Sequence, residues 1–235
     1  MSVWSARRFW TEATVTAEAG GFTVLLDARP VRTPLKAPLI LPTEGLAQAV
    51  AAEWQAQQGT VNPATMPFTR TANSAIDKVA PQFDAVAAML AEYGGTDLLC
   101  YRATDPQALI ARQAAAWDPL LDWASEALQS PLHATAGVMH IDQPAASLTR
   151  LHRSVSDLSP FQLAAFHDLV AISGSLVLAL AVTRGRLTAE QGWTLGRVDE
   201  DWQIEAWGTD AEAVEICALK RAAFLQADRF FALCG

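Results

Sequence analysis

The chain has 235 residues, of which 51% are hydrophobic and 18% are charged, and its formal net charge at pH 7 is −8. This length and apolar content allow a substantial buried core and argue against wholesale disorder. The acidic balance argues against a general nucleic-acid binder, which needs clustered Lys and Arg to neutralise phosphates. It also disfavours an anionic membrane surface as a partner.

The cysteine content and the N-terminal segment indicate the cellular compartment in which the protein is located. The cysteines are odd in number and far apart, at Cys100, Cys217 and Cys234. That usage suits a reducing compartment and not a disulfide scaffold. The longest apolar run, residues 169–182, is interrupted at Gly174 and is too short to cross a bilayer, so we expect no membrane insertion. The sequence shows neither a secretory signal nor a long Arg- and Ser-rich presequence, which leaves a bacterial cytoplasmic protein or an already processed organellar one. Because the chain begins with Met1, we expect the first.

The first part of the chain predicts a small antiparallel sheet of about three or four strands with one helix packed on it. Strands are expected where β-branched and apolar residues alternate between turn signals, at residues 13–17, 22–26, 31–33 and 39–41. Thr43 can cap a helix that continues through Trp54 to residue 58, before Gly59 ends it. Such a sheet and helix form a plausible α+β domain.

After Asn62 and Pro63 the pattern becomes mainly helical. Alanine-rich helices are expected at residues 67–79, 81–93, 106–128, 145–156, 160–172 and 175–183. Residues 94–102 and 133–141 alternate like extended segments and predict one small strand pair. The predicted fold class is therefore α+β, with a small N-terminal antiparallel sheet domain at residues 1–61 and a mainly α-helical domain at residues 62–235.

The stretch from Thr188 to Thr209 predicts a single helix with marked ends. Thr188 and Gln191 have the spacing of a capping box at the start. Gly208 suits the left-handed position after the last turn. Thr209 and Glu212 have the same capping-box spacing and predict that a further helix begins at once.

This predicted helix has two kinds of face. An apolar stripe recurs at helical spacing, at Leu195, Val198, Trp202 and Ala206. Arg197, Asp201 and Glu205 share another side, next to the tryptophans at positions 193, 202 and 207. One interpretation is a solvated charged face over a tryptophan-rich core. The other is a binding site for a protein partner, because exposed aromatic side chains rimmed by charge are typical of interface hot spots.

Catalytic and metal-binding signatures are absent. The sequence has no phosphate-binding glycine loop, no zinc-protease helix motif and no nucleophile elbow. The four histidines lack the spacing of a zinc site, so we expect no metal and no cofactor. His167 and Asp168 are expected to form a surface pair, and Cys100 to be an inert buried thiol. Trp117 and Trp123 lie next to acidic residues, and we expect them to be partly buried with the indole N–H satisfied nearby and not to bind a partner.

Several stretches together resemble a known family, the assembly chaperones of the F-type ATP synthase that act on the α subunit of its catalytic head. The resemblance extends over nearly the whole chain. It is carried by RRFW (7–10), LDARPVRTP (26–34), LPTE (41–44), AAEWQAQ (51–57), NPATMPFTRTANSAID (62–77), GTDLLCYRA (95–103), AAWDPLLDWA (115–124) and QIEAWG (203–208). Ala28 departs from the glycine common in the family, and Asp199 and Asp201 stand where relatives tend to carry glutamate.

The resemblance implies a chaperone without enzymatic activity, which holds the free α subunit until the β subunit replaces it. It also implies a small β-containing domain followed by a helical domain, and a mitochondrial matrix location for organellar relatives. A protein that competes with a natural neighbour of the α subunit is expected to act as a monomer. The expected partner-binding residues are Asp199, Glu200, Asp201, Trp202, Glu205, Trp207 and Asp210.

Two other functions remain open at this point. The first is a hydrolase that uses an acidic cluster in an interdomain cleft, which predicts a carboxyl group of raised pKa in an enclosed pocket. The second is a helical adaptor that binds an unrelated protein.

Overall fold

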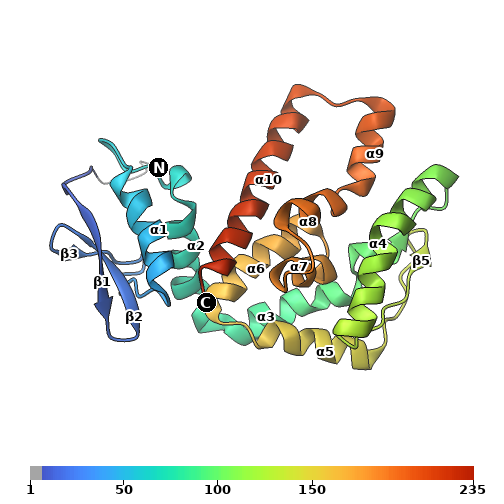
Figure 1. Ribbon diagram of the computed structural model, residues 1–235, viewed down its shortest axis with the longest axis horizontal. Helices are drawn as coiled ribbons and strands as arrows, with labels where there is room; N and C mark the ends of the chain where they lie inside the picture. Colours follow the sequence, from blue (N-terminus) through green and yellow to red (C-terminus); the bar gives the residue numbers. More distant parts are fainter. Residues whose placement is uncertain (1–6) are drawn as a thin grey trace. The chain divides into compact units, whose positions relative to one another are not determined.

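The computed structural model describes residues 7–235, and these form two compact units (Figure 1). The first unit contains the described residues up to Phe83 together with Ser159–Ala165 and Arg229–Gly235. The second contains Asp84–Leu158 and Phe166–Asp228. The domain boundary expected after residue 61 stays a prediction, because compactness does not test which segments fold independently.

The first unit is built on a three-stranded antiparallel sheet, which confirms the predicted α+β class. The strands lie in the order β1 (Ala13–Glu18), β2 (Gly21–Leu26) and β3 (Arg29–Pro30). The strands expected at 31–33 and 39–41 were wrong, because there the backbone makes only isolated bridges, such as Leu41 with Phe22. Prolines at positions 34, 38 and 42 lack the N–H groups that a continuous ladder needs.

Helix α1 (Glu44–Gln55) packs on β1 and β2 and closes the core of this unit. As predicted, Thr43 caps it, since its hydroxyl oxygen accepts a hydrogen bond from the Leu46 N–H at 3.2 Å. The same hydroxyl donates to the Leu233 carbonyl. Phe230 and Cys234 are buried in the same core as Leu46 and Val50. The last residues of the sequence are therefore part of the N-terminal core.

The remaining α-helices match the sequence prediction within a few residues at their ends, except that residues 75–79 are π-helical and that the stretch 188–209 contains two helices and not one. They are α2 (Pro67–Ser74), α3 (Phe83–Ala91), α4 (Gln107–Ala127), α5 (Ala145–Ser156), α6 (Pro160–Ser173), α7 (Leu176–Thr183), α8 (Ala189–Leu195), α9 (Val198–Trp207) and α10 (Ala211–Ala232). None of the described helices combines the length and apolarity needed to span a bilayer.

The predicted strand pair exists but is shorter than expected. Strands β4 (Tyr101–Arg102) and β5 (Thr135–Ala136) pair in parallel. Residues 94–100, expected to be extended, instead contain two short 3₁₀ turns, at Glu92–Gly95 and Leu98–Cys100. The Asp97 carboxylate favours the second turn, because it accepts a hydrogen bond from the Leu99 N–H at 3.1 Å.

Helix α7 lies at the centre of the second unit, and all its residues from Leu176 to Val182 are buried. Its first turn is held by a buried carboxylate, because Asp97 accepts hydrogen bonds from the Ser175 hydroxyl at 2.6 Å and the Val177 N–H at 2.9 Å. Burial raises the pKa of the Asp97 carboxyl, and these hydrogen bonds oppose that shift. The arrangement joins the 3₁₀ turn at Leu98–Cys100 to the start of α7.

We predict that Asp97→Ala lowers the free energy of unfolding by about 3 kcal/mol, because buried donors on Ser175, Val177 and Leu99 lose their acceptor. Chemical denaturation monitored by circular dichroism measures the change. Asp122→Ala is the matched control, since Asp122 is exposed on α4, and should shift stability by less than about 0.5 kcal/mol. Equal stability of the two variants would contradict the assigned role of Asp97.

Candidate partner-binding surface

The stretch from Thr188 to Thr209 forms two helices, so the prediction of a single helix was wrong. The predicted capping box at Thr188 and Gln191 is present and starts α8. The break falls at Gly196 and Arg197, and Arg197 adopts a non-helical conformation. The Leu195 carbonyl instead accepts a hydrogen bond at 2.8 Å from the indole N–H of Trp117, which is fully buried in α4. This tertiary bond replaces an intrahelical one.

Two of the predicted site carboxylates hold α9 against α4. Arg112 donates to both oxygens of Glu205, at 2.7 and 2.8 Å, and its guanidinium group lies 6.0 Å from the Trp202 ring centre. Gln113, which is buried, donates to Asp199 at 2.6 Å. The hydrogen bonds from Arg112 hold the pKa of the Glu205 carboxyl below its ordinary value.

A third carboxylate is paired within the α8–α9 segment. Arg197 donates to Asp201 at 3.0 Å, as the predicted i, i+4 spacing suggested. The Arg197 guanidinium group also lies 5.1 Å from the ring centre of Trp193, which is buried. Trp193 is therefore a core residue, and Trp202 is half-buried. Of the three tryptophans in this stretch, only Trp207 presents most of its surface to solvent, with 79% exposed.

The turn between α9 and α10 is closed by Asp210 and not by Thr209. Gly208 has a positive φ of 78°, as its predicted position after the helix requires. The Asp210 carboxylate accepts a hydrogen bond from the Ala213 N–H at 2.7 Å and so caps α10. The capping box expected at Thr209 and Glu212 was wrong, because the Thr209 hydroxyl donates to the neighbouring Asp210 carbonyl.

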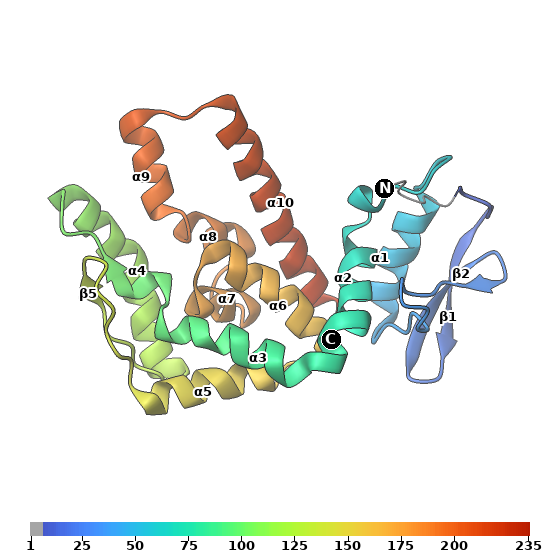
Figure 2. The ribbon, with the colours of Figure 1, turned by 180° about the vertical axis from the view of Figure 1, so that it is seen from behind.

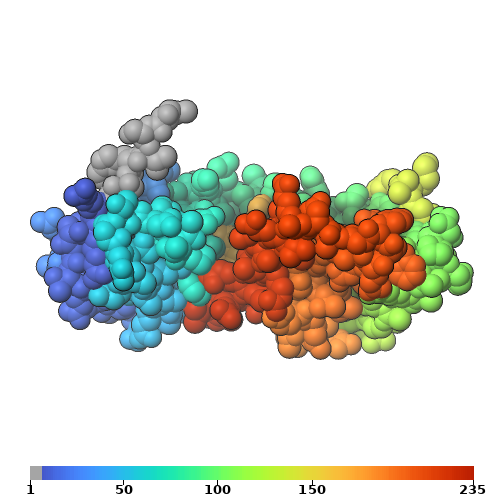
Figure 3. Space-filling model, turned by 90° about the horizontal axis from the view of Figure 1, so that it is seen from above, coloured from blue at the N-terminus to red at the C-terminus, as the bar shows by residue number. Residues whose placement is uncertain are grey.

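Helices α9 and α10 are joined at one end (Figure 1). They border an open groove of about 630 Å³. Its apolar lining comes from Ile204 and Trp207 on α9 and from Val214 and Ile216 on α10. Val214 is 54% exposed and Leu219, further along α10, is 65% exposed. Figure 3 shows the atoms of α9 and of the start of α10 at the surface of this face.

The apolar residues at the start of α10 were not among the predicted partner-binding residues. Their spacing carries a signal, because Val214, Ile216 and Leu219 lie on different sides of a helix. They cannot all be buried by one packing contact. Such a pattern indicates apolar surface left exposed at the start of α10.

This part of the chain is strongly acidic. Between Val198 and Leu219 it contains seven carboxylates and no Lys or Arg. Those on α9 include the predicted Asp199, Asp201 and Glu205, which have partners as described above. Glu200 is exposed and borders the groove. Arg197 and Lys220 also line the groove. The surface therefore combines exposed apolar side chains with a charged rim in which carboxylates predominate.

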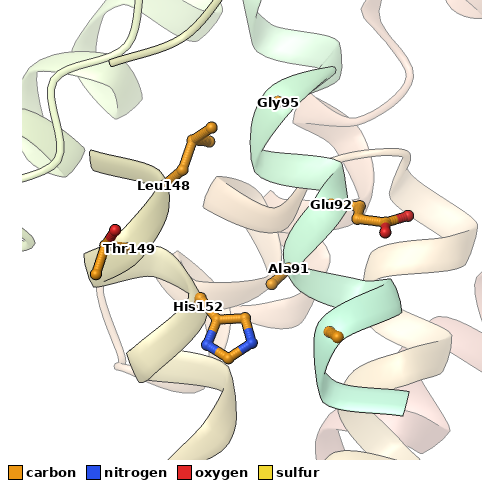
Figure 4. Close-up of a pocket in the computed structure, with 7 residues that line it drawn as sticks. Ala91, Glu92, Gly95, Leu148, Thr149 and His152 are labelled. Carbon is orange, nitrogen blue, oxygen red and sulfur yellow. The ribbon is translucent and has the colours of Figure 1, made fainter. Parts of the chain in front are cut away.

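A second hollow of about 640 Å³ is lined by residues of α3, of the turn Glu92–Gly95 and of α5. Figure 2 shows α3 and α5 from behind. Small residues on one side face Leu148, Thr149 and His152 on the other. In Figure 4 the Glu92 carboxylate points away from the His152 ring. No acid–base pair converges there.

The structure gives little support to catalysis by an acidic cluster. The carboxyl groups of raised pKa are Glu53 and Asp97, in both cases mainly through burial. Both serve the fold, since Glu53 accepts hydrogen bonds from the Phe68 and Thr69 N–H groups at the start of α2. The carboxylates of α9 lie on an open face. Among residues 7–235, no three metal-ligating side chains gather closely enough to hold an ion.

An open face of exposed apolar side chains with a carboxylate rim is typical of a protein-binding surface. The comparisons with known proteins agree with this class. The family model "ATP12 chaperone protein" matches residues 7–125. This chain therefore belongs to the ATP12 chaperone family, the chaperones of ATP synthase assembly that the sequence motifs resemble.

Solved structures and a curated relative support the same assignment. The crystal structure of ATP12 from Paracoccus denitrificans is 54% identical, with a TM-score of 0.95 over 98% of this chain and 99% of that one. A protein from Agrobacterium tumefaciens is 42% identical, with a TM-score of 0.93 over 98% of this chain and 87% of that one. The mitochondrial ATP12 protein of Schizosaccharomyces pombe is 26% identical over 90% of this chain and 77% of its own length.

We predict that Arg112→Ala speeds backbone amide exchange in α9, because this helix loses its paired hydrogen bonds from α4. Hydrogen–deuterium exchange with mass spectrometry measures the effect. Arg153→Ala is the matched control, since it removes the same charge from an exposed position on α5. Unchanged exchange in α9 of the Arg112 variant would show that the ion pair does not hold the helix.

Proposed function

We propose that this chain binds the free α subunit of the F-type ATP synthase catalytic head and holds it until the β subunit replaces it. Family membership supports the assembly role, and the resemblance of the sequence motifs supports the choice of the α subunit. The observation that carries the proposal is the exposed surface on α9 and the start of α10. An isolated subunit of a ring exposes apolar interface that would otherwise aggregate.

The composition of this surface suits temporary binding. Apolar side chains such as Trp207 and Val214 can cover apolar surface of the partner, and the surrounding carboxylates keep the free chaperone hydrated. A partly polar interface of moderate size can be displaced by a neighbour that binds more tightly. We further propose that the chain acts as a monomer. Similarity to a bacterial protein of 54% identity supports a bacterial cytoplasmic location.

The predicted partner-binding residues have different roles within this proposal. Asp199, Glu205 and Trp202 orient α9 through α4. Asp201 is held by Arg197. Glu200 and Trp207 are free to contact a partner directly, and Asp210 fixes the turn between the helices.

The test is size-exclusion chromatography with purified α subunit, with and without β subunit. A complex that β displaces is the expected result. A folded chain that never coelutes with α, with or without nucleotide, would overturn the choice of partner. Copurification from cell extract would then identify the protein bound by an adaptor of another kind.

We predict that replacing four carboxylates of α9 by amides weakens capture of the α subunit at least about tenfold. Glu200 would lose the charge that faces the partner, and the other three would lose the charge through which they orient α9. The substitutions are Asp199→Asn, Glu200→Gln, Asp201→Asn and Glu205→Gln. Fluorescence anisotropy with labelled α subunit measures the affinity, and circular dichroism confirms folding.

A matched control removes the same charge elsewhere in the second unit. It carries Asp84→Asn, Asp122→Asn, Glu126→Gln and Asp157→Asn, all at exposed positions. This control should bind the α subunit like the unmodified protein. Equal affinity of both folded quadruple variants would refute the assignment of the site to α9.

A further inference from the structure

The segment from the end of α9 to the middle of α10 is a helical arm whose side chains are almost free of packing. Every residue from Gln203 to Ile216 is exposed. Within it, Trp207, Val214 and the groove between them present apolar surface to water. Isolated exposed apolar residues are ordinary, but a contiguous set that lines a groove marks a site that another molecule covers.

The shape of the site favours a partner that inserts side chains into the groove over one that binds with a flat surface. The groove between α9 and α10 holds about 630 Å³, within the range of sites that enclose a ligand group. Trp207 and Ile204 form the apolar wall on α9, and Ala213, Val214 and Cys217, which share one face of α10, form the other. A wall on each side can bury one or two bulky apolar side chains of a partner segment.

The charge of the side chains around the groove determines which partner segments can bind there. Glu200 on α9 lines the groove and has no cation bonded to it among the described residues, whereas Asp201 is occupied by Arg197. Lys220 on α10 also lines the groove. From Arg197 to Lys220 seven carboxylates outnumber two cations, so a net charge of −5 still places a negative field over the arm. An acidic segment would be repelled, and so would the same arm of a second copy of this chain. A Lys or Arg next to the inserted side chain would be attracted.

We propose that the groove receives a basic amphipathic segment of the captured subunit. One bulky apolar side chain of this segment inserts between Trp207 and Val214, and an adjacent Lys or Arg pairs with Glu200. The inference rests on the proposed function, and it names the recognition element that this function requires. Helix-in-groove recognition uses the same combination of an apolar anchor and flanking charge.

The first test compares two double variants for binding to the α subunit. Trp207→Ala with Val214→Ala removes the apolar walls and should weaken binding at least about tenfold, as truncation of a buried anchor does. Val138→Ala with Met139→Ala removes two side chains of similar exposure, 93% and 77%, from the loop after β5. This control should bind like the unmodified protein.

A second test locates the bound segment through Cys217, which lines the groove and is partly exposed. A benzophenone maleimide should react with this thiol selectively, because burial raises the pKa of the Cys100 and Cys234 thiols to about 12. Irradiation of the complex followed by mass spectrometry identifies the crosslinked segment of the α subunit. A Cys217→Ser, Val138→Cys protein labels the control loop instead.

The expected result is a crosslink from Cys217 to a segment with a bulky apolar residue beside Lys or Arg, and none to that segment from position 138. Capture of the α subunit at unchanged affinity by the Trp207→Ala, Val214→Ala variant would overturn the groove and leave the proposed function intact. A crosslinked segment without Lys or Arg would overturn its basic character. Failure of the unmodified protein to bind the α subunit would overturn both proposals.

Discussion

The buried Asp97 carboxylate is the contact on which the second unit depends. It satisfies donors at the start of α7, a helix so apolar that almost every side chain is buried. With α7 fixed, Gly192 of α8 can pack directly against Val182, where any larger residue would collide. The end of α8 then meets the Trp117 indole, and α9 starts from that point. The position of the helical arm formed by α9 and the start of α10 thus follows from the fully buried Asp97 carboxylate.

The base and the end of the arm differ in how they are stabilised. At its base, α9 is tied to α4 by Arg112 and Gln113. Towards Trp207 and the start of α10, no comparable side-chain packing exists among the described residues, and the side chains face water. Carboxylates there oppose self-association of the exposed apolar groups. A chaperone that must release its subunit benefits from a surface that is preformed at the base but not sealed by its own core.

The sequence predicted most of the elements, because local signals determine them. Thr43 and the Thr188–Gln191 pair mark helix starts through bonds to nearby backbone, and α5 begins and ends where its pattern indicated. The break at Gly196 escaped prediction because it depends on Trp117, which is 78 residues away in the chain. The partners of Asp199 and Glu205 on α4 are likewise tertiary, so the sequence identified the acidic face without showing which carboxylates remain free.

Residues 229–235 complete the core of the first unit, so this core can form only after they have been synthesised. The sheet and α1 leave the ribosome early, yet Phe230 and Cys234 complete the core that surrounds Leu46. Until those last residues emerge, the nascent N-terminal segment carries an incomplete apolar core. This chaperone therefore cannot complete the core of its first unit before residues 229–235 have been translated.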